Sequence, residues 1–274
     1  KMQGSQQQDC GKKRKKPEYV YGNYPFYYGY RVGKTLEEDP RVSVFKREWI
    51  ENRDCLDIGC NEGHVTIALA VKFCCKSMVG VDIDSKLIYK ARCNLQHEVE
   101  ALEKEEKSKE DERKQGGEQK NSGKTPSTDS EEAAVVQKAA IGLELSERVT
   151  FKTQNYLDVY CKPGTYDTIL CLSISKWIHL NWGDEGLLKF FAKVFKELRP
   201  GGRLVLEPQP WESYSKKRRV SEVTRKNFQR IKLRPDNFPS ILTEKIGFKF
   251  YEEISSELPS DKSGFRRPLF VYHK

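Results

Sequence analysis

The sequence has no apolar run that approaches the roughly 20 residues of a membrane-spanning helix, and its first residues do not form a secretory signal. Hydrophobic residues make up 37% of the 274 residues, enough to build the core of one α/β domain. Mean hydropathy is nevertheless −0.74, which is more polar than a compact domain requires. We therefore expect no membrane association through a span, and we expect part of the chain to be solvated rather than packed.

Cysteine pairs with the C-x-x-C spacing of metal and redox sites are also absent, although the chain has eight cysteines. Several of them lie in apolar, strand-like segments, where a reduced thiol packs as a small hydrophobe. We therefore expect no metal site and a reducing compartment, the cytosol or the nucleus. The chain begins at Lys1 rather than at a methionine, so we expect a piece of a longer protein.

Charge is not balanced, because the formal net charge is +9 and the isoelectric point is near 9.0. A surplus of this sign favours a polyanionic partner such as nucleic acid or phosphate, although an anionic membrane surface attracts the same charge. Charge alone does not choose between these partners.

Two segments have compositions that cannot build a core. Residues 1–18 end in a run of lysines and arginines and are predicted to form a flexible basic tail. Residues 99–138 are rich in Glu, Lys, Ser, Gln and Gly, so we expect their first part to extend a helix and the rest to form a low-complexity insertion. The remaining chain, residues 19–274, is predicted to form one domain.

The domain begins with an aromatic segment. Residues 19–30 contain seven Tyr and Phe residues, interrupted by Gly, Asn and Pro, which predicts an irregular arm that docks on the rest of the domain. Trp177, Trp182 and Trp211 lie later in the chain, and either RNA-base stacking or core packing fits them.

Strand-like segments recur after the arm, separated by helix-like stretches. They lie at residues 55–58, 78–81, 148–151, 166–171, 203–206, 248–254 and 268–272. The alternation predicts a doubly wound, seven-stranded, mostly parallel sheet with helices on both faces. Only a loop joins the last two strands, so they must pair antiparallel and give the sheet an antiparallel C-terminal strand.

A glycine-containing turn follows the first strand, at Asp57, Gly59, Asn61 and Gly63, and opens an apolar helix. Glycines at such offsets let the backbone approach a ligand closely at a helix N-terminus. Asp82 ends the next strand, about 20 residues on, where a carboxylate can accept hydrogen bonds from ribose hydroxyls. The two features together indicate a nucleoside-containing cofactor.

Dehydrogenases share this pattern, but they need a turn that binds pyrophosphate. Asp57 would repel pyrophosphate, whereas S-adenosylmethionine carries a sulfonium and an amino group and no phosphate. The motifs resemble those of class I, Rossmann-like, S-adenosylmethionine-dependent methyltransferases. Asn61 stands where many members have glycine, and asparagine tolerates left-handed backbone, so we expect the turn to be kept.

Three segments narrow the resemblance: residues 21–30 in the arm, residues 56–61 in the first turn, and residues 173–184 after the fourth strand. Together they resemble the Bin3 family, and the likeness spans residues 19–274. The resemblance implies transfer of a methyl group from S-adenosylmethionine, with S-adenosylhomocysteine as product, to the γ-phosphate of a 5′-triphosphate RNA. It further implies a 7SK-like small nuclear RNA, a La-related protein and the positive transcription elongation factor b complex as partners, and a nuclear location.

The turn motifs and the family resemblance give one expected cofactor-binding set: Tyr30, Arg41, Asp57, Gly59, Cys60, Asn61, Gly63, Asp82, Ile83, Asn155, Tyr156 and Leu172. Lys176 and His179 are expected at the reacting phosphate, and the expected RNA-binding or phosphate-binding residues are Trp177, Lys216, Lys217, Arg218 and Arg219. These segments follow strands whose carboxyl ends meet at one edge of a parallel sheet, where ligands bind. For His179 a structural role remains an alternative, and for residues 216–219 a solvated face or a nuclear import signal.

Two other functions fit parts of the sequence. An RNA-base or protein methyltransferase would share the cofactor motifs, but such enzymes often carry Asn/Asp-Pro-Pro-Tyr/Phe after the fourth strand, where this chain has Leu-Ser-Ile-Ser-Lys. A non-catalytic RNA-binding scaffold of a ribonucleoprotein would use the positive charge without needing intact cofactor motifs. Both alternatives stay open at the level of the sequence.

Overall fold

The computed structural model describes residues 19–25, 27, 39–116, 145–255 and 267–274. The predicted basic tail, Tyr30 and the greater part of the predicted insertion lie outside the described residues.

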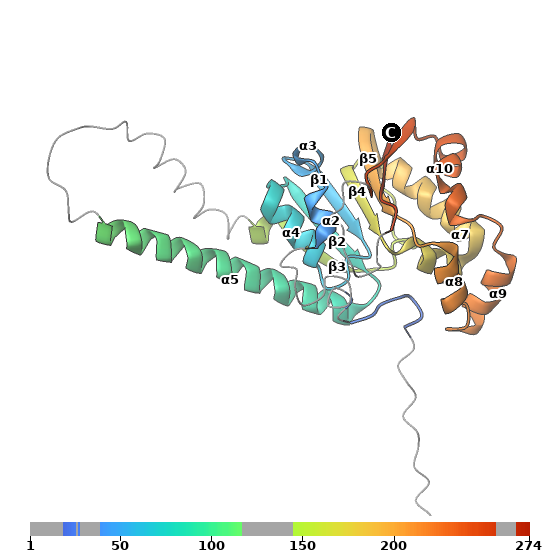
Figure 1. The fold of residues 1–274 in the computed structure, drawn as a ribbon, viewed down its shortest axis with the longest axis horizontal. Helices are drawn as coiled ribbons and strands as arrows, with labels where there is room; N and C mark the ends of the chain where they lie inside the picture. Colours follow the sequence, from blue (N-terminus) through green and yellow to red (C-terminus); the bar gives the residue numbers. More distant parts are fainter. Residues whose placement is uncertain (1–18, 26, 28–38, 117–144, 256–266) are drawn as a thin grey trace, which may run out of the picture.

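A seven-stranded sheet forms the centre of the described chain, as predicted. Its strands are β1 (Asp54–Ile58), β2 (Ser77–Asp82), β3 (Val149–Thr153), β4 (Tyr166–Leu172), β5 (Leu198–Glu207), β6 (Phe250–Glu253) and β7 (Phe270–His273). Their order in the sheet is β3-β2-β1-β4-β5-β7-β6 (Figure 1). The first five run parallel, and β7 pairs antiparallel with both β5 and β6. The expected antiparallel strand is therefore confirmed, and it is inserted between β5 and β6.

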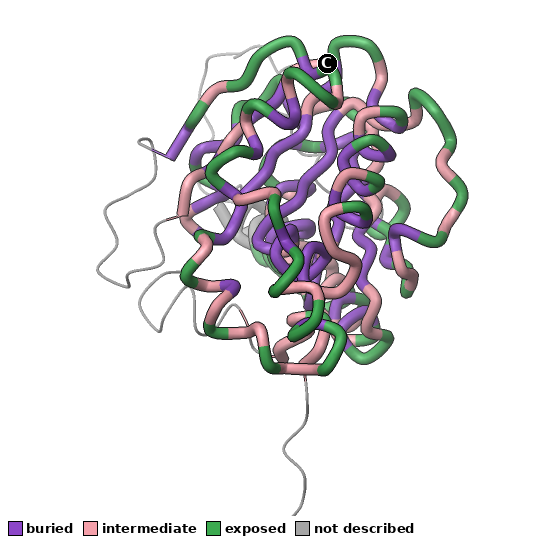
Figure 2. Tube along the Cα trace, turned by 90° about the vertical axis from the view of Figure 1, so that its right-hand side faces the viewer, coloured by how far each residue is buried: buried purple, intermediate pink, exposed green. Residues whose placement is uncertain are grey.

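Helices cover both faces of the sheet, which confirms the doubly wound prediction. The helical elements are α2 (Pro40–Ser43), α3 (Arg47–Ile50), α4 (His64–Phe73), α5 (Ser85–Gly116), α7 (Ser175–Glu197), α8 (Trp211–Lys217), α9 (Glu222–Arg230), a 3₁₀ turn (Pro235–Asn237), α10 (Phe238–Ser240) and a π-helical segment (Ile241–Ile246). Leu69 of α4 and Ile88 of α5 belong to one hydrophobic core, and Phe190 and Val194 of α7 belong to the other. The central strands β1, β4 and β5, which lie between these cores, are largely buried (Figure 2).

Helix α5 continues past the sheet and projects from the body (Figure 1). It runs to Gly116, so the first part of the predicted insertion does extend a helix, as expected. Its N-terminal part packs on the body, since Ile88 and Ala91 are buried in the same core cluster as Leu69 of α4.

Parallel strands place the carboxyl ends of β1, β2, β4 and β5 at one edge of the sheet, and the backbone turns sharply there. Non-glycine residues with positive φ stand at two of these ends, Asn61 (φ 54°) after β1 and Ser173 (φ 64°) after β4. Two more such residues, Asn52 and Cys74, precede β1 and β2 at the opposite edge, so these angles do not distinguish the edges. Ligands of parallel α/β sheets bind beyond the carboxyl ends of the strands, which is where a site is expected.

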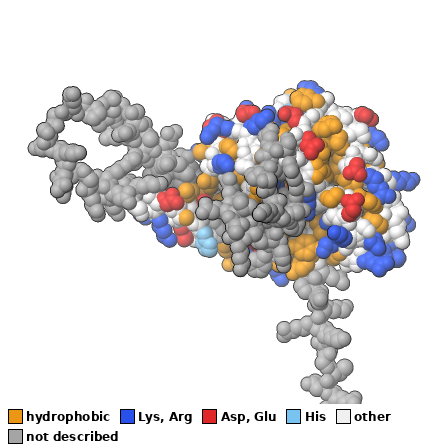
Figure 3. Space-filling view, in the orientation of Figure 1, with side chains coloured by type: hydrophobic (Ala, Val, Ile, Leu, Met, Phe, Trp, Pro, Cys, Tyr) orange, Lys and Arg blue, Asp and Glu red, His pale blue; other side chains and the backbone are white. Residues whose placement is uncertain are grey.

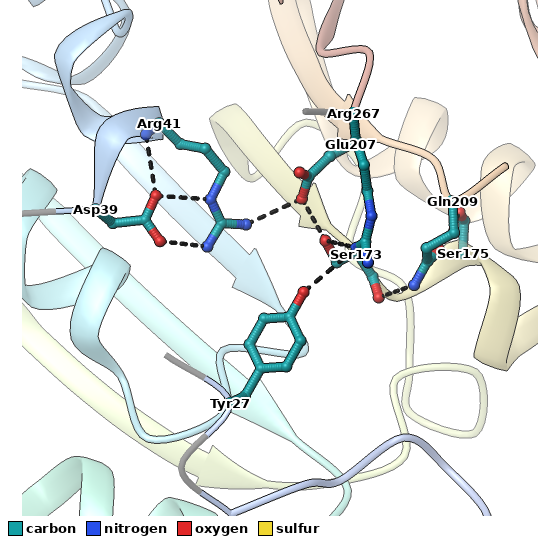
Figure 4. A network of polar contacts seen from close by, with 8 residues as sticks. All are labelled: Tyr27, Asp39, Arg41, Ser173, Ser175, Glu207, Gln209 and Arg267. Carbon is teal, nitrogen blue, oxygen red and sulfur yellow. Dashed lines mark hydrogen bonds and ion pairs between the residues drawn. The ribbon is translucent and has the colours of Figure 1, made fainter. Parts of the chain in front are cut away.

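A buried ion-pair network ties the N-terminal helix α2 to this edge (Figure 4). Arg41 is 1% exposed and donates from Nε and Nη2 to the carboxylate of Asp39, at 2.9 and 2.7 Å. Its Nη1 donates to Glu207 Oε2 at the end of β5, at 3.0 Å. Glu207 also accepts a hydrogen bond from the hydroxyl of Ser173, so the ends of β4 and β5 are joined to α2.

We predict that Arg41→Met lowers the free energy of unfolding by about 3–5 kcal/mol, because it leaves two buried carboxylates without their cation. Arg47→Met is the matched control. Arg47 pairs with Glu51 at 2.8 Å, but its side chain is 61% exposed, and such surface pairs contribute at most about 1 kcal/mol. Urea denaturation measures both variants, and equal destabilisation would contradict the structural role given to the Arg41 network.

Candidate functional site

A cavity of about 510 Å³ opens at the carboxyl ends of β1, β2 and β4, within the size range of small-molecule sites. The expected site residues that line it are Gly59, Asn61, Asp82, Ile83, Asn155, Tyr156, Leu172, Lys176, Trp177 and Lys217. The expected residues that do not line it are Arg41, Asp57, Cys60, Gly63, His179, Lys216, Arg218 and Arg219. The expected residues therefore divide into those that line the cavity and those that lie outside it.

The turn after β1 forms one wall of the cavity. Gly59 has φ 76°, and a Cβ at this position would lie 2.3 Å from Cγ2 of Ile174, so no larger residue fits. Asn61 has φ 54°, which confirms that asparagine maintains the left-handed turn. Its side-chain oxygen accepts from the backbone N–H of Glu62 at 2.9 Å and its nitrogen donates to Tyr24 O at 3.1 Å. This asparagine therefore joins the turn to the N-terminal arm.

Asp82 presents a buried carboxylate at the end of β2. It accepts from the backbone N–H groups of Asn61 and Asp84, each at 3.0 Å, and burial raises its pKa against these hydrogen bonds. Each carboxylate oxygen retains a further lone pair, which a hydroxyl donor can use. The geometry suits the recognition of a ribose.

Asp57 lies beneath the turn rather than on the cavity. Its carboxylate is 3% exposed and accepts from Thr66 Oγ1 at 2.6 Å. Burial raises its pKa to about 6. Cys60 and Gly63 are likewise in the support of the turn, and a Cβ on Gly63 would lie 2.7 Å from the Phe151 ring. Direct contact of these three residues with a cofactor stays a prediction.

Asn155 and Tyr156 lie in the loop after β3, at the same end of the cavity as Asp82. The carboxamide of Asn155 shapes the loop, because its nitrogen donates to Asp158 at 2.6 Å and its oxygen accepts from Leu157 N at 3.2 Å. The Tyr156 hydroxyl donates to Glu197 at 2.6 Å, which fixes the ring against the cavity. A polar loop and an immobilised ring are suited to a flat, heteroatom-rich group such as a purine.

Three cationic side chains converge at the other end of the cavity. Lys176 donates to Ser213 Oγ at 2.7 Å. Arg267 donates to Ser173 Oγ at 2.7 Å and to Tyr27 OH at 3.3 Å (Figure 4). Lys217 lies over the ring of Tyr24, 5.0 Å from its centroid. Burial, together with the positive charges of Arg267 and Lys217, lowers the pKa of Lys176 to about 7. Mutual repulsion of this kind is relieved when an anion binds between the cations.

Gln209 holds this end of the cavity in place. Its side-chain oxygen accepts from Lys176 N at 3.1 Å and from Ser175 Oγ at 3.3 Å, and its nitrogen donates to Ser173 O. Because Gln209 follows β5 and the other three residues follow β4, the amide locks the two strand ends together. It is 2% exposed, so water does not compete for these bonds.

The arm docks on α7, as predicted, and forms part of the cavity wall. Tyr21 stacks on Trp182 with ring centroids 5.7 Å apart, and Tyr24 packs edge-on against Trp177 at 5.9 Å. A Cβ on Gly22 would lie 2.0 Å from Nε1 of Trp177, so the arm approaches this tryptophan as only glycine allows. Trp177 and Trp182 thus pack against the arm.

His179 has a position different from the one expected. It is fully buried outside the cavity, with Nε2 2.7 Å from Asp184 Oδ1 and Nδ1 3.4 Å from Tyr214 OH. Burial lowers its pKa, although Asp184 acts in the opposite direction. Both ring nitrogens face protein groups, so this geometry supports the structural alternative and gives no support to a phosphate contact.

The basic run after β5 is also divided. Lys217 reaches the cavity, whereas Lys216 and Arg219 are exposed outside it. Arg218 donates to Ser215 O at 2.6 Å and lies over the ring of Phe228.

Six lining residues with amide, aliphatic hydroxyl or guanidinium side chains were not assigned to the site from the sequence: Asn23, Gln154, Ser173, Gln209, Ser213 and Arg267. Gln209 and Ser213 follow β5, whose carboxyl end was expected at the site, so their position was an available signal. Arg267 precedes the final strand, and it reaches the cavity only because β7 is inserted beside β5. No local sequence pattern reveals that approach.

Among the described residues, no group of three or more His, Cys, Asp or Glu residues could hold a metal ion. No helix among them is both long enough and apolar enough to cross a membrane.

Comparison with known proteins places the chain among RNA-modifying enzymes. Residues 166–274 match the family model described as Bicoid-interacting protein 3 (Bin3). The chain is 43% identical to a probable RNA methyltransferase of Arabidopsis thaliana, over 96% of this chain and 83% of that protein. It is 40% identical to the 7SK snRNA methylphosphate capping enzyme of Homo sapiens, over 97% of this chain but 41% of that protein.

A third relative is the U6 snRNA methylphosphate capping enzyme Amus of Drosophila melanogaster. The identity is 34%, over 93% of this chain and 75% of that protein. Two relatives above 30% identity are thus covered over more than two thirds of their own length. The chain belongs to the Bin3 family of RNA methyltransferases.

Proposed function

We propose that this protein transfers a methyl group from S-adenosylmethionine to the terminal phosphate at the 5′ end of an RNA. The observation that carries the proposal is the charge distribution along one cavity. Among the described residues that line the cavity, Asp82 is the one with a carboxylate, and it lies at one end. Lys176, Lys217 and Arg267 lie at the other end. A cationic donor with a ribose and an anionic acceptor fit the two ends in that order.

The residues present fit the methyl donor. Asp82 would accept hydrogen bonds from ribose hydroxyls, Tyr156 and the backbone after β3 would flank the adenine, and Gly59 leaves room for close approach of the donor to the turn. When bound, S-adenosylmethionine supplies a methyl group on a positively charged sulfur. The chain's own contribution is to orient that group toward the cationic end and to exclude water from the space between.

The acceptor needs no general base. A terminal phosphate has a second pKa near ~6, so at neutral pH its oxygen is already largely anionic and nucleophilic. The task of the protein is to hold the remaining phosphate charge while the oxygen aligns with the methyl group. Lys176 and Arg267 suit this task, because Ser213, Ser173 and Tyr27 already fix their heads.

A neutral base acceptor fits this end of the cavity less well. Three cations held close together repel one another, and a base with no charge would leave that repulsion uncompensated. Several phosphates, rather than one, match three cations, which favours the triphosphate end of an unprocessed transcript. The pure scaffold alternative would not need the donor end of the cavity.

The names of the relatives extend the proposal to the kind of RNA. The human relative is named for 7SK snRNA and the Drosophila relative for U6 snRNA, so we take a small nuclear RNA as the proposed substrate class. A nuclear location follows from that class. A La-related protein and the positive transcription elongation factor b complex remain proposed partners, and this chain spans 41% of the human relative.

We predict that methyl-labelled S-adenosylmethionine labels an RNA transcript that carries a 5′-triphosphate. Treating the same transcript with phosphatase beforehand should abolish the labelling, because the attacking oxygen has been removed. A 5′-monophosphorylated copy should be labelled with a higher KM, because it engages fewer cations. Equal labelling of the phosphatase-treated RNA would refute the phosphate acceptor and favour a base.

We predict that Asp82→Asn weakens donor binding at least about tenfold, because hydrogen bonds to a charged group contribute about 1.5–3 kcal/mol. Affinity for RNA should stay within a factor of about two, since the cationic end is unchanged. Asp158→Asn, which alters an exposed carboxylate beside Asn155, is the control. Calorimetry of donor binding measures both variants. Unchanged donor binding in Asp82→Asn would contradict the assignment of Asp82 to ribose recognition.

We predict that kcat/KM for RNA is greatest between about pH 6 and pH 7. Below pH ~6 the terminal phosphate is protonated and a weaker nucleophile. Above the Lys176 pKa of about 7, the amine loses its charge in the free enzyme and phosphate binding weakens. Lys176→Arg should remove the alkaline decline, because arginine keeps its charge. Lys217→Arg should keep the decline, and an unaltered alkaline limb in Lys176→Arg would refute this role for Lys176.

A further inference from the structure

One short segment carries a net positive charge almost as large as that of the whole chain. Residues 216–234 contain nine lysines and arginines and one acidic residue, a net charge of +8, whereas the whole chain carries +9. The segment comprises the end of α8, helix α9 and the loop that follows. Figure 3 shows lysine and arginine side chains gathered at the edge where these helices lie.

The segment adjoins the cationic end of the cavity. Ser213 and Lys217 of α8 line the cavity, and α9 begins five residues later, at Glu222. Outside the cavity, the exposed basic residues of the segment are Lys216, Arg219, Arg225, Lys226, Arg230 and Lys232. The one carboxylate, Glu222, pairs with Arg225 at 2.7 Å and lies 3.8 Å from Lys226, so most of the positive charge is not neutralised within the segment.

Hydrogen bonds to α7 anchor this segment. Asp184 accepts from the backbone N–H groups of Lys232 and Leu233, at 2.9 and 3.3 Å, and is itself held by the buried His179. The side chain of Asn227 donates to Leu180 O at 3.0 Å. These hydrogen bonds, backed by the buried His179, give α9 a fixed place beside the cavity, which a merely solvated charged face does not require.

The aromatic rings of the segment offer no free platform for a base. Trp211 stacks on Phe228 with centroids 4.9 Å apart and an interplanar angle of 8°. Arg234 lies 3.5 Å from the Trp211 centroid, and Arg218 lies 5.8 Å from that of Phe228. Each ring thus has an aromatic neighbour and a guanidinium, and the surface between the cations is one that meets phosphates rather than bases.

We propose that the surface formed by α8, α9 and residues 231–234 binds the sugar–phosphate backbone of the RNA body whose 5′ end lies in the cavity. The proposal rests on the proposed function and adds a second contact, outside the cavity, that is independent of RNA sequence. An RNA that leaves the triphosphate at Lys176 and Lys217 passes onto α8 and then along α9. Basic residues that contact phosphates release counterions, so this contact must weaken steeply with salt.

The test is the salt dependence of binding to a 5′-triphosphorylated RNA hairpin, measured by fluorescence anisotropy with the whole chain. The triple variant Lys226→Gln, Arg230→Gln, Lys232→Gln removes three exposed cations that have no place in the cavity. Its slope of log affinity against log salt should fall by about 2, since each phosphate contact contributes about 0.7–0.9. The matched control, Lys72→Gln, Lys104→Gln, Lys245→Gln, removes three exposed lysines elsewhere and should keep the wild-type slope.

Methyl transfer gives a second readout. The triple variant should show a KM at least about tenfold higher for the hairpin near 0.15 M salt, with kcat unchanged. For a 5′-triphosphorylated dinucleotide, too short to reach α9, its kinetics should equal those of the wild type. A triple variant with the wild-type salt slope, or a control variant with an equally reduced slope, would contradict the proposal that this surface binds the RNA backbone. If the wild-type protein and the triple variant bind the hairpin with the expected salt slopes but the wild-type protein methylates neither RNA, the proposed function is wrong. The proposal that this surface binds RNA is then still supported.

Discussion

The carboxylate of Glu207 is the group on which the geometry of the site most depends. It is buried at the end of β5, receives Arg41 from α2, and accepts the hydroxyl of Ser173 from the end of β4. Ser173 in turn receives Arg267 from the segment before β7. Four segments far apart in the sequence therefore meet at one charge. A buried carboxylate is tolerated only with such partners, so the loss of any one of them leaves a buried charge incompletely compensated.

From this arrangement follows a cavity with unlike ends. The turn after β1 and the carboxylate of Asp82 form the end suited to a ribose, because backbone N–H groups fix the carboxylate while leaving lone pairs for hydroxyls. Lys176, Lys217 and Arg267 form the end suited to phosphate. Chemistry that needs only alignment and charge compensation fits this division, because a phosphate oxygen is already anionic at neutral pH. The basic surface along α9 continues the same charge outside the cavity.

The sequence predicted the sheet, the turn and Asp82 well because each depends on local signals: alternating apolar runs, glycines at fixed offsets and a carboxylate at a strand end. It predicted that Lys176 lies at the cavity, because the residue follows a strand whose end was expected there, while a role at the reacting phosphate stays a prediction. It could not place His179, which lies one helical turn after Lys176 on α7. A side chain at that position can point into the cavity or into the core, and the contact with Asp184 shows that this one points away from the cavity. Arg267 depends on how β7 inserts, which is a long-range pairing.

The central claim is that the methyl group is transferred to an oxygen of the terminal phosphate. Mass spectrometry of the 5′-terminal nucleotide, released by nuclease from an RNA treated with the protein and S-adenosylmethionine, tests it most directly. The account predicts that one methyl group is found on the triphosphate moiety and that the nucleoside itself is unmodified. A methyl group on the base or ribose, with an unmodified triphosphate, would contradict it.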